Sequence, residues 1–152
     1  MTTRSLTEGE IREATPCFTN HLNYGAVKIH NTKWFVFQPD DTAMTPRGDV
    51  HFPPGHYKAD FSVDTASMSW LIHELGHSWQ FQTGQWVMTR GIYEREYKYG
   101  TLSHESVFAD FNIEQQASIV EDLYRLSKGM KTRRGDGSLA VYRAVVPMTR
   151  PK

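Results

Sequence analysis

The sequence predicts an α+β fold, in which a small, mostly antiparallel sheet packs on two helices. Short runs that alternate apolar and polar residues, typical of strands, fall between residues 25 and 52. Two longer segments, residues 66–82 and 112–128, repeat apolar residues every three or four positions, as amphipathic helices do. The length of 152 residues suits one hydrophobic core, so we expect residues 1–152 to form one domain.

Composition and charge argue against several classes of function. The chain has 17 basic and 17 acidic residues, and this zero balance argues against a nucleic-acid binder or a polybasic membrane anchor. No apolar run is long enough to span a membrane. The first ten residues lack the apolar core of a signal peptide, so we expect synthesis in the cytoplasm and secretion by a route without a cleavable signal. Cys17 has no cysteine to pair with, and we expect it to be a buried small residue.

The N-terminal half is predicted to contain a short helix and three strands. Thr7 and Glu10 match a capping box, and the helix that they begin is expected to end near Pro16. Strands are predicted in three segments separated by turn-forming residues, namely 25–30, 34–37 and 49–52.

The second half begins with the helix of residues 66–82, which Gly84 is expected to end. After the second long helix, residues 131–138 are basic and rich in glycine, which predicts a mobile surface loop. Residues 139–146 are predicted to add a strand. The sequence leaves open where the basic loop and tail, residues 131–152, lie relative to the core.

One segment of the 66–82 helix carries the strongest chemical signal. Two histidines four positions apart, with a glutamate after the first, form the stretch His73-Glu74-Leu75-Gly76-His77. Positions i and i+4 lie one turn apart on the same helix face, so both imidazoles can reach one zinc ion at about 2.0–2.1 Å. Glu74 would lie beside the ion, where it can act as the general base on a metal-activated water.

Gly76, inside this segment, indicates a close contact with another part of the chain. A glycine inside a helix costs roughly 1 kcal/mol relative to alanine, so we expect another segment to approach the helix closely there. The alternative interpretation is two surface histidines and a solvated glutamate. The apolar face that Leu71, Leu75 and Trp79 form on the same helix favours the metal site instead.

A catalytic zinc site needs a third protein ligand. The extended motif that would supply a third histidine is absent, because Gln80 and Thr83 stand at its positions. We choose Glu114, because Ala117 three residues later would let its helix pack closely on the metal helix. The alternative for Glu114 is an acidic residue placed at a helix N-terminus by the helix dipole. The other candidates for the third ligand are Glu94, Glu96, His104, Glu105, Asp110, Glu121 and Asp122.

Residues that assist the metal site are less certain from sequence. Glu121 and Asp122 are candidates to orient a ligating histidine through its second ring nitrogen, although surface charges are the simpler interpretation. The candidates to donate a hydrogen bond to a developing oxyanion are His104, Tyr93, Tyr97 and Tyr99.

The chain resembles a known family in these same segments. The metal helix together with Glu114-Gln115-Gln116-Ala117 resembles the gluzincin (glutamate-zincin) arrangement. Residues 4–10, 27–30 and 43–52 are similar to a bacterial family of zinc metallopeptidase effectors linked to type VI secretion. That family includes domains fused to the C-terminus of the secretion spike protein and small free-standing relatives. The resemblance covers about residues 4–128.

The resemblance implies a zincin-like fold and an antibacterial toxin that hydrolyses peptide bonds with one zinc ion. Its implied partners are a peptide or protein substrate, a cognate immunity protein and a component of the secretion spike. Its implied site of action is the periplasm of target bacteria. In zincins, a strand beside the metal helix commonly pairs with extended substrate, and residues 49–52 are the candidate strand here.

Three other interpretations remain open. A cytosolic regulatory zinc protease and a hydrolase of peptidoglycan cross-links would share the metal chemistry and differ only in substrate. A non-catalytic metal-binding module would enclose its ion with four protein ligands, whereas a catalytic site keeps one position for water.

Overall fold

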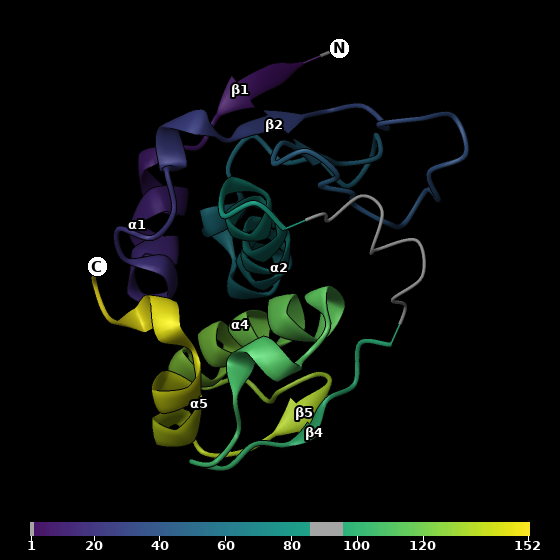
Figure 1. Ribbon diagram of the computed structural model, residues 1–152. Helices are drawn as coiled ribbons and strands as arrows, with labels where there is room; N and C mark the ends of the chain where they lie inside the picture. The colour runs from purple at the N-terminus through teal and green to yellow at the C-terminus, as the bar shows by residue number, and fades with distance from the viewer. Residues whose placement is uncertain (1, 86–95) are drawn as a thin grey trace.

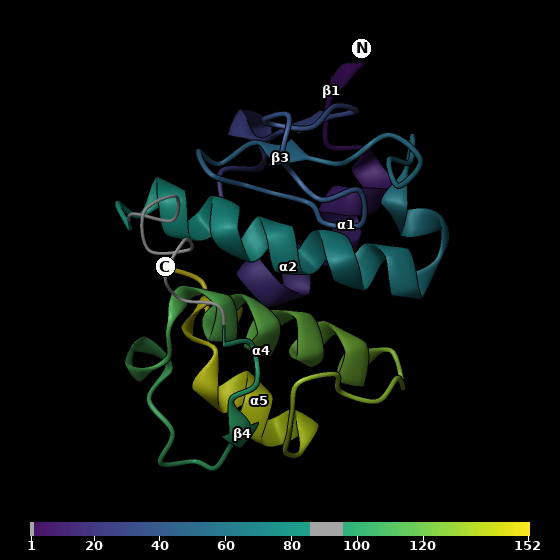
Figure 2. The same cartoon turned by 90° about the vertical axis from the view of Figure 1, so that its right-hand side faces the viewer.

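Two long helices lie side by side at the centre of the fold. The structure is a computed structural model that describes residues 2–85 and 96–152 (Figure 1). Within these residues, α2 spans Thr65–Gln82 and α4 spans Ile113–Ser127, which confirms both predicted long helices. Of the element pairs in the described residues they make the most extensive contact, and Figure 2 shows their axes running alongside each other.

The close approach of α2 and α4 depends on two small residues. A Cβ atom added to Gly76 would lie 3.2 Å from Cα and 3.3 Å from Cβ of Ala117. These distances are tighter than most real Cβ contacts, so a larger residue at position 76 would require α4 to move away by a few tenths of an ångström. The expectation of a close approach at Gly76 is therefore confirmed, and Ala117 is the residue that makes it.

The N-terminal half supplies a small sheet on the side of α2 away from α4, and a helix that contacts both α2 and α4 (Figure 2). The three strands pair in the order β1–β2–β3. Their bounds, with that of the helix α1, are Thr3–Ser5 for β1, Glu8–Phe18 for α1, Lys28–His30 for β2 and Val50–His51 for β3. The predicted capping box of Thr7 and Glu10 is present at the start of α1. The predicted end of this helix near Pro16 is wrong, because Pro16 lies in the last turn and removes a single backbone donor there.

The α+β prediction is confirmed, but the prediction of a mostly antiparallel sheet is wrong. Strand β1 pairs with β2 antiparallel, whereas β2 pairs with β3 parallel. The residues from 31 to 49 form a long connection, which allows β3 to return in the same direction as β2. The second sheet, of β4 (Gly100–Thr101) and β5 (Gly135–Asp136), is also parallel.

The strand predicted at residues 34–37 is absent. Its backbone turns instead, because the side chain of the buried Gln38 accepts a hydrogen bond from the Trp34 amide and donates to the carbonyls of Thr42 and His51. The apolar side chains of this segment are exposed, and Phe37 reaches 82%. The apolar residues 34–37 therefore lie in an exposed turn and not in the predicted strand.

The C-terminal segment packs on the far side of α4 as a helix, so the prediction of a strand at residues 139–146 is wrong. Helix α5 spans Leu139–Val145, begins with a cap by Ser138, and buries Tyr142 and Val145 against the core. Their three-residue spacing is that of a helix face. The short 3-10 helices are Tyr24–Ala26, Phe61–Val63, Phe108–Asp110 and Pro147–Thr149.

The basic loop at residues 131–138, which is predicted to be mobile, is hydrogen-bonded to α4 in the structure. It contains β5, and its arginines contact α4 as described below. Among the helices that the structure describes, none is both long and apolar enough to cross a membrane.

Candidate metal centre

Three predicted ligands meet between α2 and α4. The donor atoms of His73, His77 and Glu114, which we call the metal cluster, all lie within 4.8 Å of one another. Oε1 of Glu114 lies 2.8 Å from Nε2 of His77 and 3.2 Å from Nε2 of His73. Helix α2 presents the two imidazoles from neighbouring turns, and α4 presents the carboxylate from its first turn, across the contact of Gly76 with Ala117.

The second nitrogen of each imidazole is held by an oxygen acceptor. Nδ1 of His73 donates to Glu121 at 3.1 Å, and Nδ1 of His77 donates to the amide oxygen of Gln80 at 2.8 Å. Gln80 is oriented in turn, since its amide nitrogen donates to Gln116 and to the backbone carbonyl of residue 113. These bonds occupy both Nδ1 atoms, so that both Nε2 atoms face Glu114 and donate to it in the metal-free protein.

When a metal ion displaces the two Nε2 protons, two nitrogen lone pairs and a carboxylate oxygen converge on one place. Such a donor set attracts a cation, and imidazole and carboxylate are ligands that zinc accepts. The His₂Glu set fits a catalytic zinc site, which takes three protein ligands and leaves a fourth position.

The charges around the cluster also favour a cation. Burial by itself lowers the pKa of His73, but hydrogen bonds to Glu114 and Glu121 outweigh burial and raise it to about 10. The pKa of His77 is raised as well, because the negative charge of Glu114 outweighs its burial. Burial raises the pKa of Glu114, but His77 and His73 lower it below its usual range. The site thus stabilises positive charge at the imidazoles despite being buried.

Glu74, the predicted general base, lies at the same place with one oxygen already engaged. It is 5% exposed, and its Oε1 accepts a hydrogen bond of 2.8 Å from the hydroxyl of Thr45. The segment that carries Thr45 is held on α2 by Ser78, whose hydroxyl donates to the carbonyl of Gly48 at 2.7 Å. The Thr45 bond orients the carboxylate, and no hydrogen bond to its second oxygen is found among residues 2–85 and 96–152.

Of the two candidates to orient a histidine, Glu121 and not Asp122 makes the contact. Both are almost fully buried, so the interpretation of them as surface charges is wrong. Asp122 faces away from the cluster, where its carboxylate accepts hydrogen bonds from the hydroxyl of Tyr99 and the backbone amides of Arg133 and Arg134. The position of Asp122 on α4, one residue after Glu121, turns it to a different helix face.

Among the candidate donors to an oxyanion, Tyr97 lies at the cluster. Its ring centre is 6.0 Å from that of His73. Burial and the negative charge of Glu114 raise its pKa to about 12, so the phenol stays protonated and able to donate. Tyr99 is engaged elsewhere with Asp122 and Tyr142.

His104 and Tyr93 do not gain a role from the structure. His104 is exposed in a turn after β4, and no hydrogen bond joins it to the cluster within residues 2–85 and 96–152. Tyr93 and Glu94 lie outside the described residues. The remaining candidates for a third ligand are exposed, namely Glu96, Glu105 and Asp110.

The strand proposed to pair with substrate is not a free edge. His51 exchanges two backbone hydrogen bonds with Met44 on one side, while β3 pairs with β2 on the other. Strand β3 is the last strand of the sheet, and its outer side is occupied at His51 by this single bridge, so pairing of residues 49–52 with substrate stays a prediction. The segment around Met44 therefore lies along β3 at His51, on the side away from β2.

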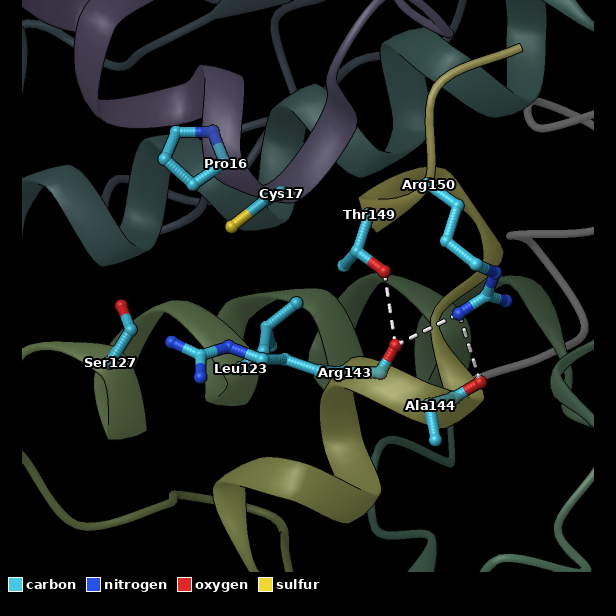
Figure 3. Close-up of a pocket in the computed structure, with 8 residues that line it drawn as sticks. All are labelled: Pro16, Cys17, Leu123, Ser127, Arg143, Ala144, Thr149 and Arg150. Atoms are coloured by element: carbon cyan, nitrogen blue, oxygen red, sulfur yellow. Dashed lines mark hydrogen bonds between the residues drawn. The ribbon is translucent and has the colours of Figure 1, made fainter.

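A cavity of about 380 Å³ lies away from the cluster, between α1, α4, α5 and the C-terminal turn (Figure 3). Cys17 lines it, and burial raises the pKa of this thiol to about 12. The thiol therefore stays protonated at neutral pH and is a poor nucleophile, in agreement with the expectation of a buried small residue. None of the residues that line this cavity belongs to the metal cluster.

Sequence reasoning undervalued Thr45, Gln80 and Glu121 as supports of the site. Glu121 lies seven positions after Glu114, two turns along the same face of α4, so this spacing was a signal that both face the metal helix. Gln80 follows His77 by three positions on α2 and was likewise within reach. Thr45 belongs to a distant loop, and only the fold brings it to Glu74.

Comparisons of sequence and of structure both find the same type VI secretion protein. The chain is 33% identical over 131 residues, or 80% of its length, to the type VI secretion system spike protein VgrG2b of Pseudomonas aeruginosa. The aligned region is only 13% of that spike protein. The solved effector domain of VgrG2b superposes with a TM-score of 0.79 at 29% identity, covering 94% of this chain and 83% of that domain. No protein-family model matches the chain.

Proposed function

Because this chain is homologous to the effector domain of a type VI secretion spike protein, we propose that its effector activity is zinc-dependent hydrolysis of peptide bonds. In this proposal the fold is zincin-like. His73, His77 and Glu114 bind one zinc ion, and Glu74 is the acid/base. The substrate is a peptide or a protein.

The main support for the proposal is that the donor atoms of the metal cluster meet at one place. Both Nε2 atoms and a carboxylate oxygen point at one place, and separate acceptors hold both Nδ1 atoms. An accidental meeting of two histidines and a glutamate would not require both imidazoles to be oriented from behind. Three protein donors also suit a catalytic centre better than a structural one, which is closed by four.

The remaining residues supply the acid–base chemistry of hydrolysis. When bound, zinc would polarise the carbonyl of the scissile bond and lower the pKa of a coordinated water towards about 7. Glu74, held by Thr45, takes up the proton of the attacking water with its second oxygen and delivers it to the leaving amine. The proposed donor of a hydrogen bond to the oxygen that gains negative charge is Tyr97, because its ring centre lies 6.0 Å from that of His73.

The purified chain is expected to cleave peptides only when zinc is bound. A library of quenched fluorescent peptides and purified peptidoglycan would be incubated with the chain as prepared, after chelation and after addition of one equivalent of zinc. We expect chelation to abolish cleavage and zinc to restore it. Cleavage that survives chelation would contradict the proposal, and so would inactivity of the zinc-bound chain on both classes of substrate.

The second half of the proposal concerns where the activity is used. The homology to a spike-borne domain supports delivery by a type VI secretion system to the periplasm of competing bacteria. The proposed partners are a component of the spike and an immunity protein that protects the producing cell. Hydrolysis in the periplasm is compatible with a protein or a peptidoglycan peptide as target.

A growth assay tests the compartment. The chain would be expressed in a sensitive bacterium with and without an added periplasmic export signal. We expect growth to stop only when the signal is present, and the exported Glu74→Gln variant to be harmless because it lacks the base. Toxicity confined to the version without a signal would contradict periplasmic action, as would normal growth with both versions.

A further inference from the structure

We propose that Arg133 and Arg134 form, with Glu121, a clamp that holds His73 in its metal-binding orientation. The three residues are called the arginine clamp below. The inference rests on the proposed metal site and adds to it a set of positioning residues from the basic loop. That loop lies outside the segments in which the sequence shows any metal motif.

Glu121 is the centre of the clamp. Its Oε1 accepts the Nδ1 proton of His73 at 3.1 Å, while its Oε2 lies 2.9 Å from the guanidinium of Arg133. The guanidinium of Arg134 lies 3.6 Å from Oε1. Glu121 is only 1% exposed, so these partners, and not solvent, surround its carboxylate. A buried carboxylate without positive partners is costly, and the two arginines therefore stabilise the charged form that His73 needs as its acceptor.

The backbone of the loop is fixed by the neighbouring acid. Asp122 accepts hydrogen bonds from the amides of Arg133 and Arg134, at 2.7 and 3.1 Å. Two adjacent acids of α4 thus bind two adjacent residues of the loop, one through the main chain and the other through the side chains. This arrangement determines where both guanidinium groups lie, since their backbones cannot shift along α4.

Arg134 also contacts residues other than Glu121 near the metal cluster. Its guanidinium lies 4.5 Å from the ring centre of Tyr97 and 3.2 Å from the hydroxyl of Ser118. The ring centre of Tyr97 lies 6.0 Å from that of the His73 imidazole. Arg134 therefore contacts both Glu121 and Tyr97, so the imidazole is held at its nitrogen and alongside its ring.

The test compares zinc affinity in the whole chain for wild type, the double variant Arg133→Gln/Arg134→Gln, and the control Arg143→Gln. Arg143 is an exposed arginine of α5 at the cavity of Figure 3, away from the cluster. Affinity would be measured by competition with a chromophoric chelator. Loss of a partner behind a ligating histidine typically weakens metal binding about 10- to 100-fold, and we expect this for the double variant but not for the control.

Two further measurements separate positioning from a general loss of structure. In the metal-free protein, the Nδ1 proton of His73 is expected to give a slowly exchanging NMR signal that disappears in the double variant. The thermal midpoint of each metal-free variant shows whether it is folded. A folded double variant with wild-type zinc affinity and an unchanged His73 signal would overturn the proposal.

Glu121→Gln provides a second route if the double variant does not fold. The amide keeps the shape of the side chain but cannot form ion pairs with the arginines. We expect the same loss of zinc affinity, and wild-type affinity would overturn the clamp. If wild type itself bound no zinc while its His73 signal depended on the arginines, the proposed function would fail and the clamp would stand.

Discussion

Glu74→Gln is expected to remove nearly all peptidase activity while zinc stays bound. The substitution keeps the size of the side chain and the hydrogen bond from Thr45, but the amide cannot accept a proton. General acid–base groups typically contribute about 10²- to 10⁴-fold to the rate, so kcat should fall within that range. Steady-state kinetics on the best peptide of the library, with metal content measured on the same samples, give the answer.

The matched control for this variant is Glu105→Gln. Glu105 is an exposed glutamate in a turn, so its amide variant removes one charge without touching the cluster. It should retain wild-type kcat. If Glu74→Gln kept wild-type activity with zinc bound, Glu74 would not be the base. If it lost zinc as well, the loss of activity would say nothing about proton transfer.

Glu114→Gln is expected to have the largest effect on metal binding. The carboxylate contributes the anionic donor of the cluster, whereas an amide nitrogen could donate a hydrogen bond to either Nε2 and stabilise the metal-free protein. The loss of zinc affinity should exceed the roughly 10- to 100-fold that follows removal of a partner behind a ligand. Chelator competition measures it, and peptidase activity should disappear at zinc concentrations that saturate wild type.

Glu96→Gln is the control for Glu114, because Glu96 is exposed and was a candidate for the same role. Wild-type affinity is expected for it. Equal affinity of Glu114→Gln and wild type would exclude Glu114 as a ligand. A loss of zinc affinity in the Glu96→Gln variant instead would indicate that Glu96 is the third ligand.

The parts of the fold that were predicted correctly are those set by local pattern. Helices α2 and α4 follow from apolar spacing, and α1 begins at a capping box that four residues define. The failures involve contacts between distant residues. Residues 34–37 look like a strand, but Gln38 bonds to the loop and to β3 and forces a turn there. Strand alternation also says nothing about direction, so the parallel pairing of β2 with β3 was missed.

Within the site, too, the residues related by local helix geometry could be predicted, and those brought together from distant segments could not. The two histidines and Glu74 lie within five consecutive residues, so helix geometry alone relates them. Glu114 was chosen because a small residue follows it, and the contact of Gly76 with Ala117 supports that reason. Thr45 and the two arginines of the clamp act from loops far away in sequence, and no periodicity connects a loop with a helix. Their contribution became visible only through the fold.

Anomalous diffraction at the zinc edge from crystals grown with zinc tests the metal site most directly. One peak is expected between α2 and α4, within about 2.0–2.2 Å of Nε2 of His73, Nε2 of His77 and a carboxylate oxygen of Glu114, with a solvent molecule completing the coordination. A zinc ion bound elsewhere, or one enclosed by four protein ligands, would contradict the assignment of this cluster as a hydrolytic centre.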